Sequence, residues 1–197
     1  TDFFRSYRKV DLADDEVVLS VTMPPRRPYE FVLPFKQARR REDDISIVTG
    51  AIRLLLAPSD SEWKVADASL AFGGVAPTAV LAPRTAAALS GQPWCAATFK
   101  AACSVLTEEL RVAVGAPGGQ AEYRSTLPAS FLFKSFVGLT IVLEGLPGVP
   151  PPPTLAEADR SAARSFVNEP KPKTSGTQEY AHAPDAAGLE VARDGAG

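Results

Sequence analysis

Two hydrophobic patterns follow one another along this chain of 197 residues, and their order constrains its fold. Alternation of apolar and polar residues, typical of half-buried strands, occurs at residues 16–23, 29–37, 45–56 and 63–72, with a short further strand at 78–81. Helical spacing follows, at residues 83–89, 96–114 and 124–143. Strands followed by helices predict an α+β fold, in which an antiparallel sheet of about four strands carries three helices on one face.

The first two predicted strands are expected to form an antiparallel hairpin, because the turn between them contains three prolines that cannot continue a strand ladder. Phe31, Leu33 and Phe35 would then point inward. Val18 and Lys36 would both lie on the opposite face. An apolar valine on an otherwise polar face is explained either by a ligand that covers the face or by ordinary edge packing.

Glycine, proline and hydroxyl residues mark the expected ends of these elements. Gly73 and Gly74 are turn glycines, and a glycine-rich stretch at 115–119 ends the second helix. Pro128 is tolerable if it falls in the first turn of the third helix, and Ser125 and Thr126 are candidates for capping it. Neither Gly73-Gly74 nor Gly118-Gly119 fits a phosphate-binding motif.

The chain divides into a compact part and a tail. Residues 1–144 are expected to form one unit with its core at about 15–144, and residues 145–197 an extended, largely disordered interdomain linker, ordered only around 164–167. The tail is proline-rich at first, then polar and rich in alanine.

Charge and cysteine content exclude several functional classes. A net charge of −2 gives no case for nucleic acid or an anionic membrane, and no apolar run approaches the ~20 residues of a membrane span. Cys95 and Cys103 form no C-x-x-C motif, and His182 is far from both in sequence, so no metal site is expected. The lack of a disulfide framework favours the cytoplasm, with the peroxisome as the alternative. Trp63 and Trp94 are expected to be packing residues.

A dense block of charge separates the second and third predicted strands. The string FKQARRREDDI, residues 35–45, contains three arginines and three acids between two apolar segments. A solvated hairpin with mutually neutralising charges is the simple interpretation, and a loop ordered for a functional purpose is the alternative.

This string resembles the C-terminal half of the flavin domain of xanthine dehydrogenases, in the molybdenum hydroxylase family. Four further segments resemble that family in the same order: TDFFRSYRKVDLADDEVVLS, LAFGGVAPTAVLAPRT, PGGQAEYRSTLPASFLFKSF and RSAARSFVNEPKPKTSGTQEY. The resemblance implies that the chain is a fragment, with the C-terminal part of an FAD-binding domain followed by the linker toward a molybdopterin domain.

The enzymes resembled oxidise hypoxanthine to xanthine and xanthine to urate. Their electrons pass from molybdenum through two [2Fe-2S] clusters to FAD and then to NAD. The resemblance therefore implies FAD in this region, molybdopterin and iron–sulfur clusters in other parts of the same polypeptide, and a homodimer. The chain alone is expected to be inactive and to contain no catalytic residue.

Two residues are identified through the resemblance as FAD contacts. Lys36 matches a family lysine, whose ammonium would offset negative charge near the flavin. Val18 matches a family leucine, so its side chain is one methylene shorter. The loop at 37–47 matches a flexible loop beside the flavin, in which Asp43 or Asp44 and Arg40 or Arg41 would tune the electron exit.

Three alternatives stay open. An aldehyde oxidase shares the plan but passes electrons to oxygen, and a less charged loop is typical of that group. A separate flavin subunit of the carbon monoxide dehydrogenase type would end soon after the last helix. A non-enzymatic binding module on the same scaffold would need neither Lys36 nor Val18.

Overall fold

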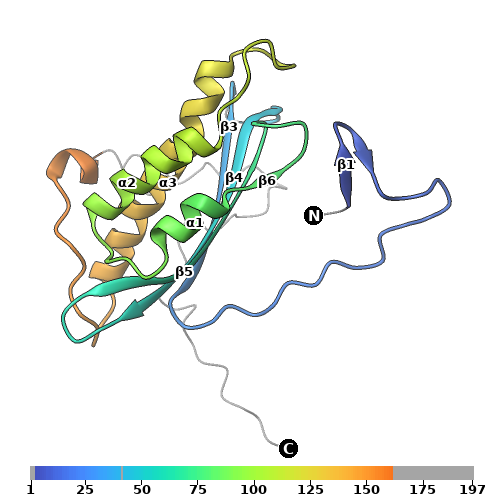
Figure 1. Cartoon of the computed structure of the whole chain (residues 1–197). Coiled ribbons are helices and arrows are strands. Elements are labelled where there is room, and N and C mark those ends of the chain that lie inside the picture. The colour runs from blue at the N-terminus through green and yellow to red at the C-terminus, as the bar shows by residue number, and fades with distance from the viewer. Residues whose placement is uncertain (1–2, 41, 162–197) are drawn as a thin grey trace, which may run out of the picture.

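The computed structural model describes residues 3–40 and 42–161. A two-stranded ribbon comes first, with β1 at Phe4–Ser6 and β2 at Lys9–Val10. A four-stranded antiparallel sheet follows in the order β3-β4-β5-β6, and three helices lie on one face of it (Figure 1). The bounds of these elements are β3 Glu30–Ala38, β4 Ser46–Pro58, β5 Trp63–Gly73, β6 Val80–Leu81, α1 Pro83–Leu89, α2 Ala96–Glu109 and α3 Ala121–Glu144. The predicted α+β class is confirmed.

The core lies between the sheet and α3. Phe35 of β3 stacks on Phe131 of α3, with ring centroids 5.1 Å apart and planes at 10°. Gly50 of β4 makes this close approach feasible, because a Cβ there would lie 3.0 Å from the Phe131 ring. Alternate residues of β4, including Val48, Ile52 and Leu54, are fully buried beneath the helices. The inward row of β3 is therefore as predicted.

Aromatic residues hold the helices together. Trp94 packs edge-on against Phe99 of α2 at 4.7 Å, and Phe99 stacks on Phe136 of α3 at the same distance. The indole Nε1 of Trp94 donates a hydrogen bond to the Thr140 hydroxyl, 2.9 Å away. Trp63 is equally buried, and its Nε1 donates to the Pro150 carbonyl. Both tryptophans are packing residues, as predicted.

Helix α3 is longer than the helix predicted at 124–143. In the described part of the chain, α3 is the one helix with the length and hydropathy of a membrane span. More than half of its most apolar window is buried within the protein. Its contacts with α2 and β4 account for this apolarity, as in the core helix of a soluble domain.

The ends of two helices differ from the prediction because tertiary hydrogen bonds decide them. Helix α2 stops at Glu109 and not near 114, since the Val112 amide donates to the Ser125 hydroxyl of α3. That bond also shows that Ser125 does not cap its own helix, and the Thr126 hydroxyl donates to the Tyr123 carbonyl. Because α3 already begins at Ala121, Pro128 lies inside the helix and not in its first turn.

The predicted strand at 16–23 and its hairpin are wrong for the described structure. These residues form no strand, and β3 pairs only with β4. The Leu56 amide donates to the Tyr29 carbonyl, so Tyr29 and Leu56 form a hydrogen-bonded pair. Hydrogen-bonded and non-hydrogen-bonded pairs alternate along an antiparallel ladder, so Pro34 belongs to a non-hydrogen-bonded pair with Ala51. The backbone nitrogen of Pro34 therefore points away from β4, to the free edge of β3. Proline has no amide hydrogen, so this edge cannot pair fully with another strand.

A tight turn before β3 also leads the chain away from a hairpin. The Glu30 amide donates to the Arg27 carbonyl, and Tyr29 has a left-handed φ of 58°. The sheet still has four strands, because β6 pairs with β5 through Ala71–Leu81 and Phe72–Val80. The short strand expected at 78–81 therefore takes the place of the missing one.

The packed layers begin at Tyr29, later than the start near residue 15 that the sequence suggested, and extend beyond residue 144. Leu155 is buried, and the Pro150 carbonyl accepts a hydrogen bond from Trp63. Arg160 forms an ion pair with Glu144 at the end of α3. Irregular chain at 145–155 thus packs against the core. The order predicted at 164–167, and His182, lie outside the described residues.

Candidate functional site on the open face of the sheet

One face of the sheet carries no helix. We call this face, with the side chains that point from it, the open face. The register places them in rows that cross the strands. The central row contains small or apolar residues on all four strands: Pro34, Ala51, Ala71 and Leu81. A second row contains Val32, Arg53 and Ser69, and a third contains Lys36, Thr49 and Gly73. Pro34, Ala51 and Leu81 are exposed to solvent.

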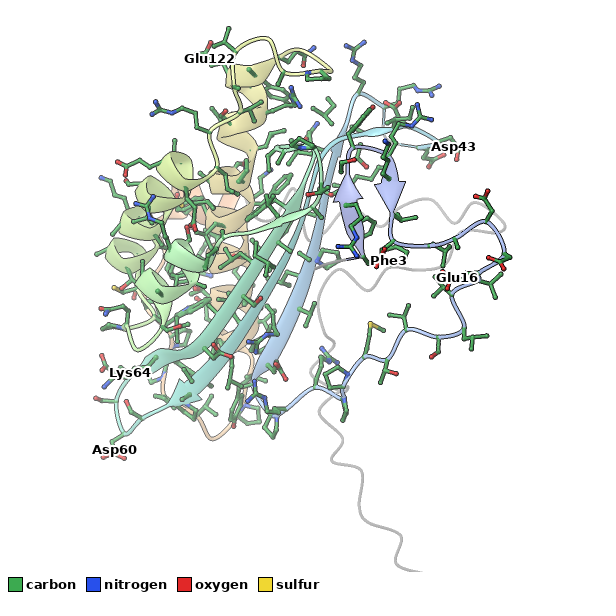
Figure 2. The ribbon with its side chains drawn as sticks, turned by 45° about the vertical axis from the view of Figure 1, so that its right-hand side comes forward. Phe3, Glu16, Asp43, Asp60, Lys64 and Glu122 are labelled. Atoms are coloured by element: carbon green, nitrogen blue, oxygen red, sulfur yellow. The ribbon has the colours of Figure 1, made fainter. Side chains whose placement is uncertain are left out.

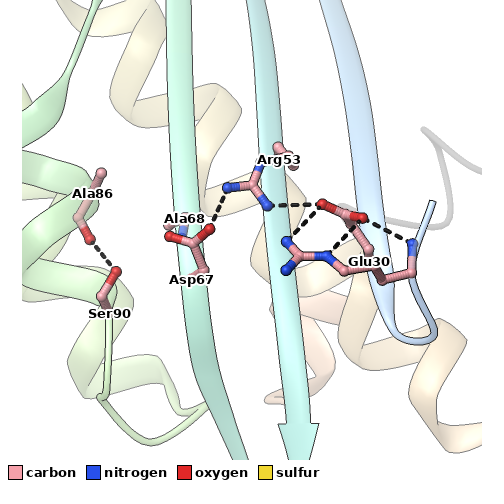
Figure 3. Close-up of polar contacts among 7 residues, drawn as sticks. Glu30, Arg53, Asp67, Ala68, Ala86 and Ser90 are labelled. Atoms are coloured by element: carbon pink, nitrogen blue, oxygen red, sulfur yellow. Dashed lines mark hydrogen bonds and ion pairs between the residues drawn. The ribbon is translucent and has the colours of Figure 1, made fainter. Parts of the chain in front are cut away.

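Charged residues occupy the end of the open face near the start of β3 (Figure 3). The Arg53 guanidinium donates to Glu30 at 2.8 Å and also pairs with Asp67 on β5. Arg27 donates to Glu30 through its side chain and its backbone amide. The Arg27 side chain, its amide and Arg53 lower the pKa of Glu30 to about 2. The hydrogen bond from Arg53 likewise lowers the pKa of Asp67.

These shifts predict a pH dependence of stability. Because the pKa of Glu30 is lowered from 4.5 to about 2 on folding, the unfolded chain binds the proton first. The stabilisation is therefore complete above pH 4.5 and is lost as the pH falls toward 2. We expect Glu30→Gln to lower the free energy of unfolding by about 1 kcal/mol at pH 7 and to flatten its fall in acid. Urea unfolding at pH 7, 4 and 3 measures both effects.

Glu62→Gln, in the exposed turn between β4 and β5, is the matched control. It should change the stability at pH 7 by less than about 0.5 kcal/mol. Parallel pH profiles for the wild type and Glu30→Gln would contradict this account of the charged network.

Lys36 lies at the opposite end of the open face. It pairs in register with Thr49 of β4, and its side chain is exposed. Immediately beyond it, the register shifts between Gln37 and Ala38, which leaves Ile47 as the extra residue of a β-bulge on β4. The structure therefore places Lys36 on the face that the alternation predicted, beside a local bend in the sheet.

The charged loop between β3 and β4 is held by its own hydrogen bonds. The Asp44 carboxylate accepts from the backbone amides of Arg40, at 2.7 Å, and of Ile45, at 2.9 Å. The Arg40 amide is the first of several donors that lower the pKa of Asp44. Asp43 adopts a left-handed φ of 47° and lies toward the tip of the loop (Figure 2). Arg41 lies outside the described residues.

Internal hydrogen bonding explains how so charged a loop is ordered without a partner. Arg40 also donates to the Asp43 carbonyl at 2.9 Å, so its side chain is used within the loop. Asp44 has a structural role in this turn. The assignment of these residues as modulators of electron exit stays a prediction.

Val18 lies apart from the sheet. It belongs to an extended segment without secondary structure, and 56% of its surface is exposed. Glu16, two residues earlier, lies well away from the sheet on its helix-free side (Figure 2). The structure therefore does not bring Val18 and Lys36 onto one sheet, so the prediction that they share a sheet face is wrong for the described structure. Whether Val18 contacts a cofactor is a separate prediction.

Arg124 is a residue near this site that the sequence analysis missed. It lies in the first turn of α3 and is buried. Its Nε donates to the Gly119 carbonyl at 2.8 Å and its Nη1 to the Gly74 carbonyl at 2.9 Å. Its Nη2 reaches the carbonyls of Pro117 and Ala116. The guanidinium thus joins the glycine-rich loop to the end of β5, next to Gly73. An arginine just before the apolar part of a helix was the available signal.

The open face suits a flat ligand with negative charge. Small side chains at Ala51, Ala71 and Gly73 leave room for a ring, and Lys36 contributes a positive charge at one end. Among the described residues, no cluster of three or more His, Cys, Asp or Glu could hold a metal ion.

Comparison with protein families places the fold. The model of the CO dehydrogenase flavoprotein C-terminal domain matches residues 34–139. The chain belongs to this family. The matched region runs from the middle of β3 into α3, and so includes Lys36, the charged loop, Arg124 and most of the open face. As a member of the flavoprotein domain family, the chain is related to domains of FAD-binding proteins.

Individual relatives are oxidoreductases. The chain is 44% identical to xanthine dehydrogenase from Oryza sativa subsp. japonica over 139 residues, 71% of this chain and 10% of that protein. It is 36% identical to aldehyde oxidase 1 from Bos taurus over 144 residues, 73% of this chain and 11% of that protein. The chain thus spans about a tenth of the length of these relatives.

A solved structure agrees with the fold. Quinoline 2-oxidoreductase from Pseudomonas putida 86 superposes with a TM-score of 0.55 at 26% identity. The superposition covers 67% of this chain and 44% of that one. The arrangement of sheet and helices is therefore that of the flavoprotein domain.

Proposed function

We propose that this chain is the C-terminal part of the FAD-binding domain of a xanthine dehydrogenase. The complete enzyme would oxidise hypoxanthine to xanthine and xanthine to urate, with electrons passing from molybdenum through iron–sulfur clusters to FAD and NAD. The identity of 44% to a xanthine dehydrogenase, within a flavoprotein domain family, is the observation that carries this proposal. The remaining domains of the same polypeptide would be its partners, in a cytoplasmic homodimer.

The part of this chain would be to bind and orient the cofactor, and FAD when bound would supply the electron transfer. Lys36 would place a positive charge beside it, and the apolar central row of the open face would exclude water. No residue of the chain needs to take part in purine chemistry. The 197 residues alone are therefore expected to form no urate.

Aldehyde oxidase is the second candidate, and the bovine relative favours it at 36% identity. The two functions differ in the electron acceptor, which would be oxygen for an oxidase and NAD for a dehydrogenase. The densely charged loop supports the dehydrogenase, since a less charged loop is typical of the oxidases. Reduction of NAD by xanthine, measured on the complete polypeptide, separates them.

Replacement of Lys36 tests the cofactor site. In the complete polypeptide, Lys36→Ala should weaken FAD binding about 3- to 10-fold and lower the flavin midpoint potential by about 20 mV, because a charge worth about 1 kcal/mol is removed. FAD titration followed by flavin fluorescence, and a potentiometric titration, measure the two effects. Val18→Asp should also weaken FAD binding if Val18 contacts the cofactor.

Lys100→Ala is the matched control, because Lys100 is an exposed lysine on α2 in the helix layer. It should leave both quantities unchanged. If Lys36→Ala behaves like Lys100→Ala, the assignment of Lys36 fails, and the binding-module alternative gains support.

A further inference from the structure

The segment at residues 16–23 has the sequence of a strand and the exposure of an unfolded chain. Its alternate apolar side chains Val17, Leu19, Val21 and Met23 are 75–92% exposed. Large apolar side chains at every second position of an extended chain are typical of a strand with one buried face. Four of them in a row, all exposed, make a surface that soluble proteins normally cover.

The sheet of this chain cannot cover the segment. The free edge of β3 presents Pro34 at its centre, and the nitrogen of Pro34 points to that edge. At the other edge β6 has two residues, too few to pair with eight. The remaining outer edge of β5 is already hydrogen-bonded at Trp63 and Val65 to the chain at 91–94. The β1–β2 ribbon offers strands of three and two residues, all exposed. Within the described residues there is no edge of sufficient length.

A second copy of the chain is no better as a partner. Each copy presents the same blocked β3 edge and the same short β6. Two copies of the segment could pair only with each other, and an isolated two-stranded ribbon has too little buried surface to be stable. The partner therefore has a β-sheet with a free edge and an apolar layer beneath it, which the described part of this chain does not offer.

We propose that residues 16–23 form an edge strand of a second β-sheet, located in another folding unit of the same polypeptide. Val17, Leu19, Val21 and Met23 would lie against the apolar layer of that unit, and backbone pairing would give the affinity. Two observations locate the partner outside this domain: the flavoprotein family model begins at residue 34, after the segment, and the relatives are about ten times longer than the matched region.

The proposal also gives the face of Val18. In a docked strand, Val18 lies with Ser20 and Thr22 on the side opposite the buried row. Val18 would then reach a cofactor only when the segment is docked. The naming of the second unit as the rest of the FAD-binding domain rests on the proposed function, whereas the strand pairing does not.

Amide hydrogen exchange tests the pairing. In the 197-residue chain at low concentration, the amides of residues 17–23 should exchange at the rate of an unstructured peptide. In the complete polypeptide, alternate amides of the segment should exchange at least about 100-fold more slowly, with or without FAD. The amides of β4 provide an internal reference for folding in every sample.

Two lysine substitutions provide the matched pair. Val21→Lys places a charge in the buried row and should abolish the protection of residues 17–23, whereas Thr22→Lys, on the other face, should retain it. Retained protection of β4 would show that the Val21→Lys polypeptide is folded. Equal effects of the two substitutions would overturn the assigned face.

Three other outcomes overturn the proposal. Rapid exchange of the segment in the complete polypeptide would show that nothing pairs with it. Protection in the 197-residue monomer would indicate a hairpin with β3, and protection that rises with its concentration would indicate a second copy. If the segment is protected while Lys36→Ala leaves FAD affinity unchanged, the strand stands and the proposed cofactor site fails.

Discussion

Replacing Arg124 with methionine should lower the free energy of unfolding by about 3 kcal/mol or more, because it removes charged hydrogen bonds inside the protein. Methionine keeps most of the apolar length of arginine, so little packing is lost. The carbonyls of Gly74, Gly119 and Pro117 would lose the donor that now holds them together. The expected cost is high because the arginine is buried, and buried carbonyls that lose a donor are costly.

The measurement is urea unfolding of the 197-residue chain. With a slope of about 2 kcal/mol per molar urea, the midpoint should fall by about 1.5 M. Arg111→Met, at an exposed position just after α2, should change stability by less than about 0.5 kcal/mol. Arg124→Lys should recover little, since one ammonium cannot reach carbonyls on both sides of the site. Equal midpoints for the two methionine variants would refute a structural role of the guanidinium.

Most of the fold could be predicted because its strands and helices are local patterns. Phe31, Leu33 and Phe35 alternate and do face the helices, and Pro83 marks the start of α1. The same reasoning failed at residues 16–23, where the pattern is equally clear. An alternating hydrophobic pattern shows which residues can form a strand, but it does not show which sheet that strand joins. That choice depends on the direction of the Pro34 nitrogen, which only the register reveals.

The candidate site also contains one residue that could be placed from the sequence and others that could not. Lys36 could be placed on a face by counting, and the structure agrees. The companion role of Val18 depended on the hairpin and was lost with it. The role of Arg124 could not be assigned from the sequence, because its partners are backbone carbonyls of two loops that are about 45 residues apart in the chain, Gly74 and Gly119. Backbone carbonyls carry no sequence signature.

Gly74→Ala should be the second large effect, with a loss of about 3 kcal/mol of stability. Gly74 has a φ of +83°, and a Cβ there would lie 2.2 Å from the Ile47 carbonyl oxygen. The oxygen belongs to the backbone and the Cβ is fixed rigidly to the Cα, so a strand must move to relieve the contact. Ile47 is the bulge residue of β4 beside Lys36, and the displacement would therefore reach the open face.

Gly91→Ala separates the two causes of the lost stability, which are the strain of a left-handed backbone and the close contact with Ile47. Gly91 has nearly the same φ, +79°, but a Cβ there would meet no atom within 4 Å. Its substitution should therefore cost only the strain of a left-handed backbone, about 1 kcal/mol. The difference between the two variants in urea unfolding measures the close approach of β5 to β4. If they are equally destabilised, the 2.2 Å contact is relieved without cost, and the bulge beside Lys36 is a soft feature of the sheet and not a fixed one.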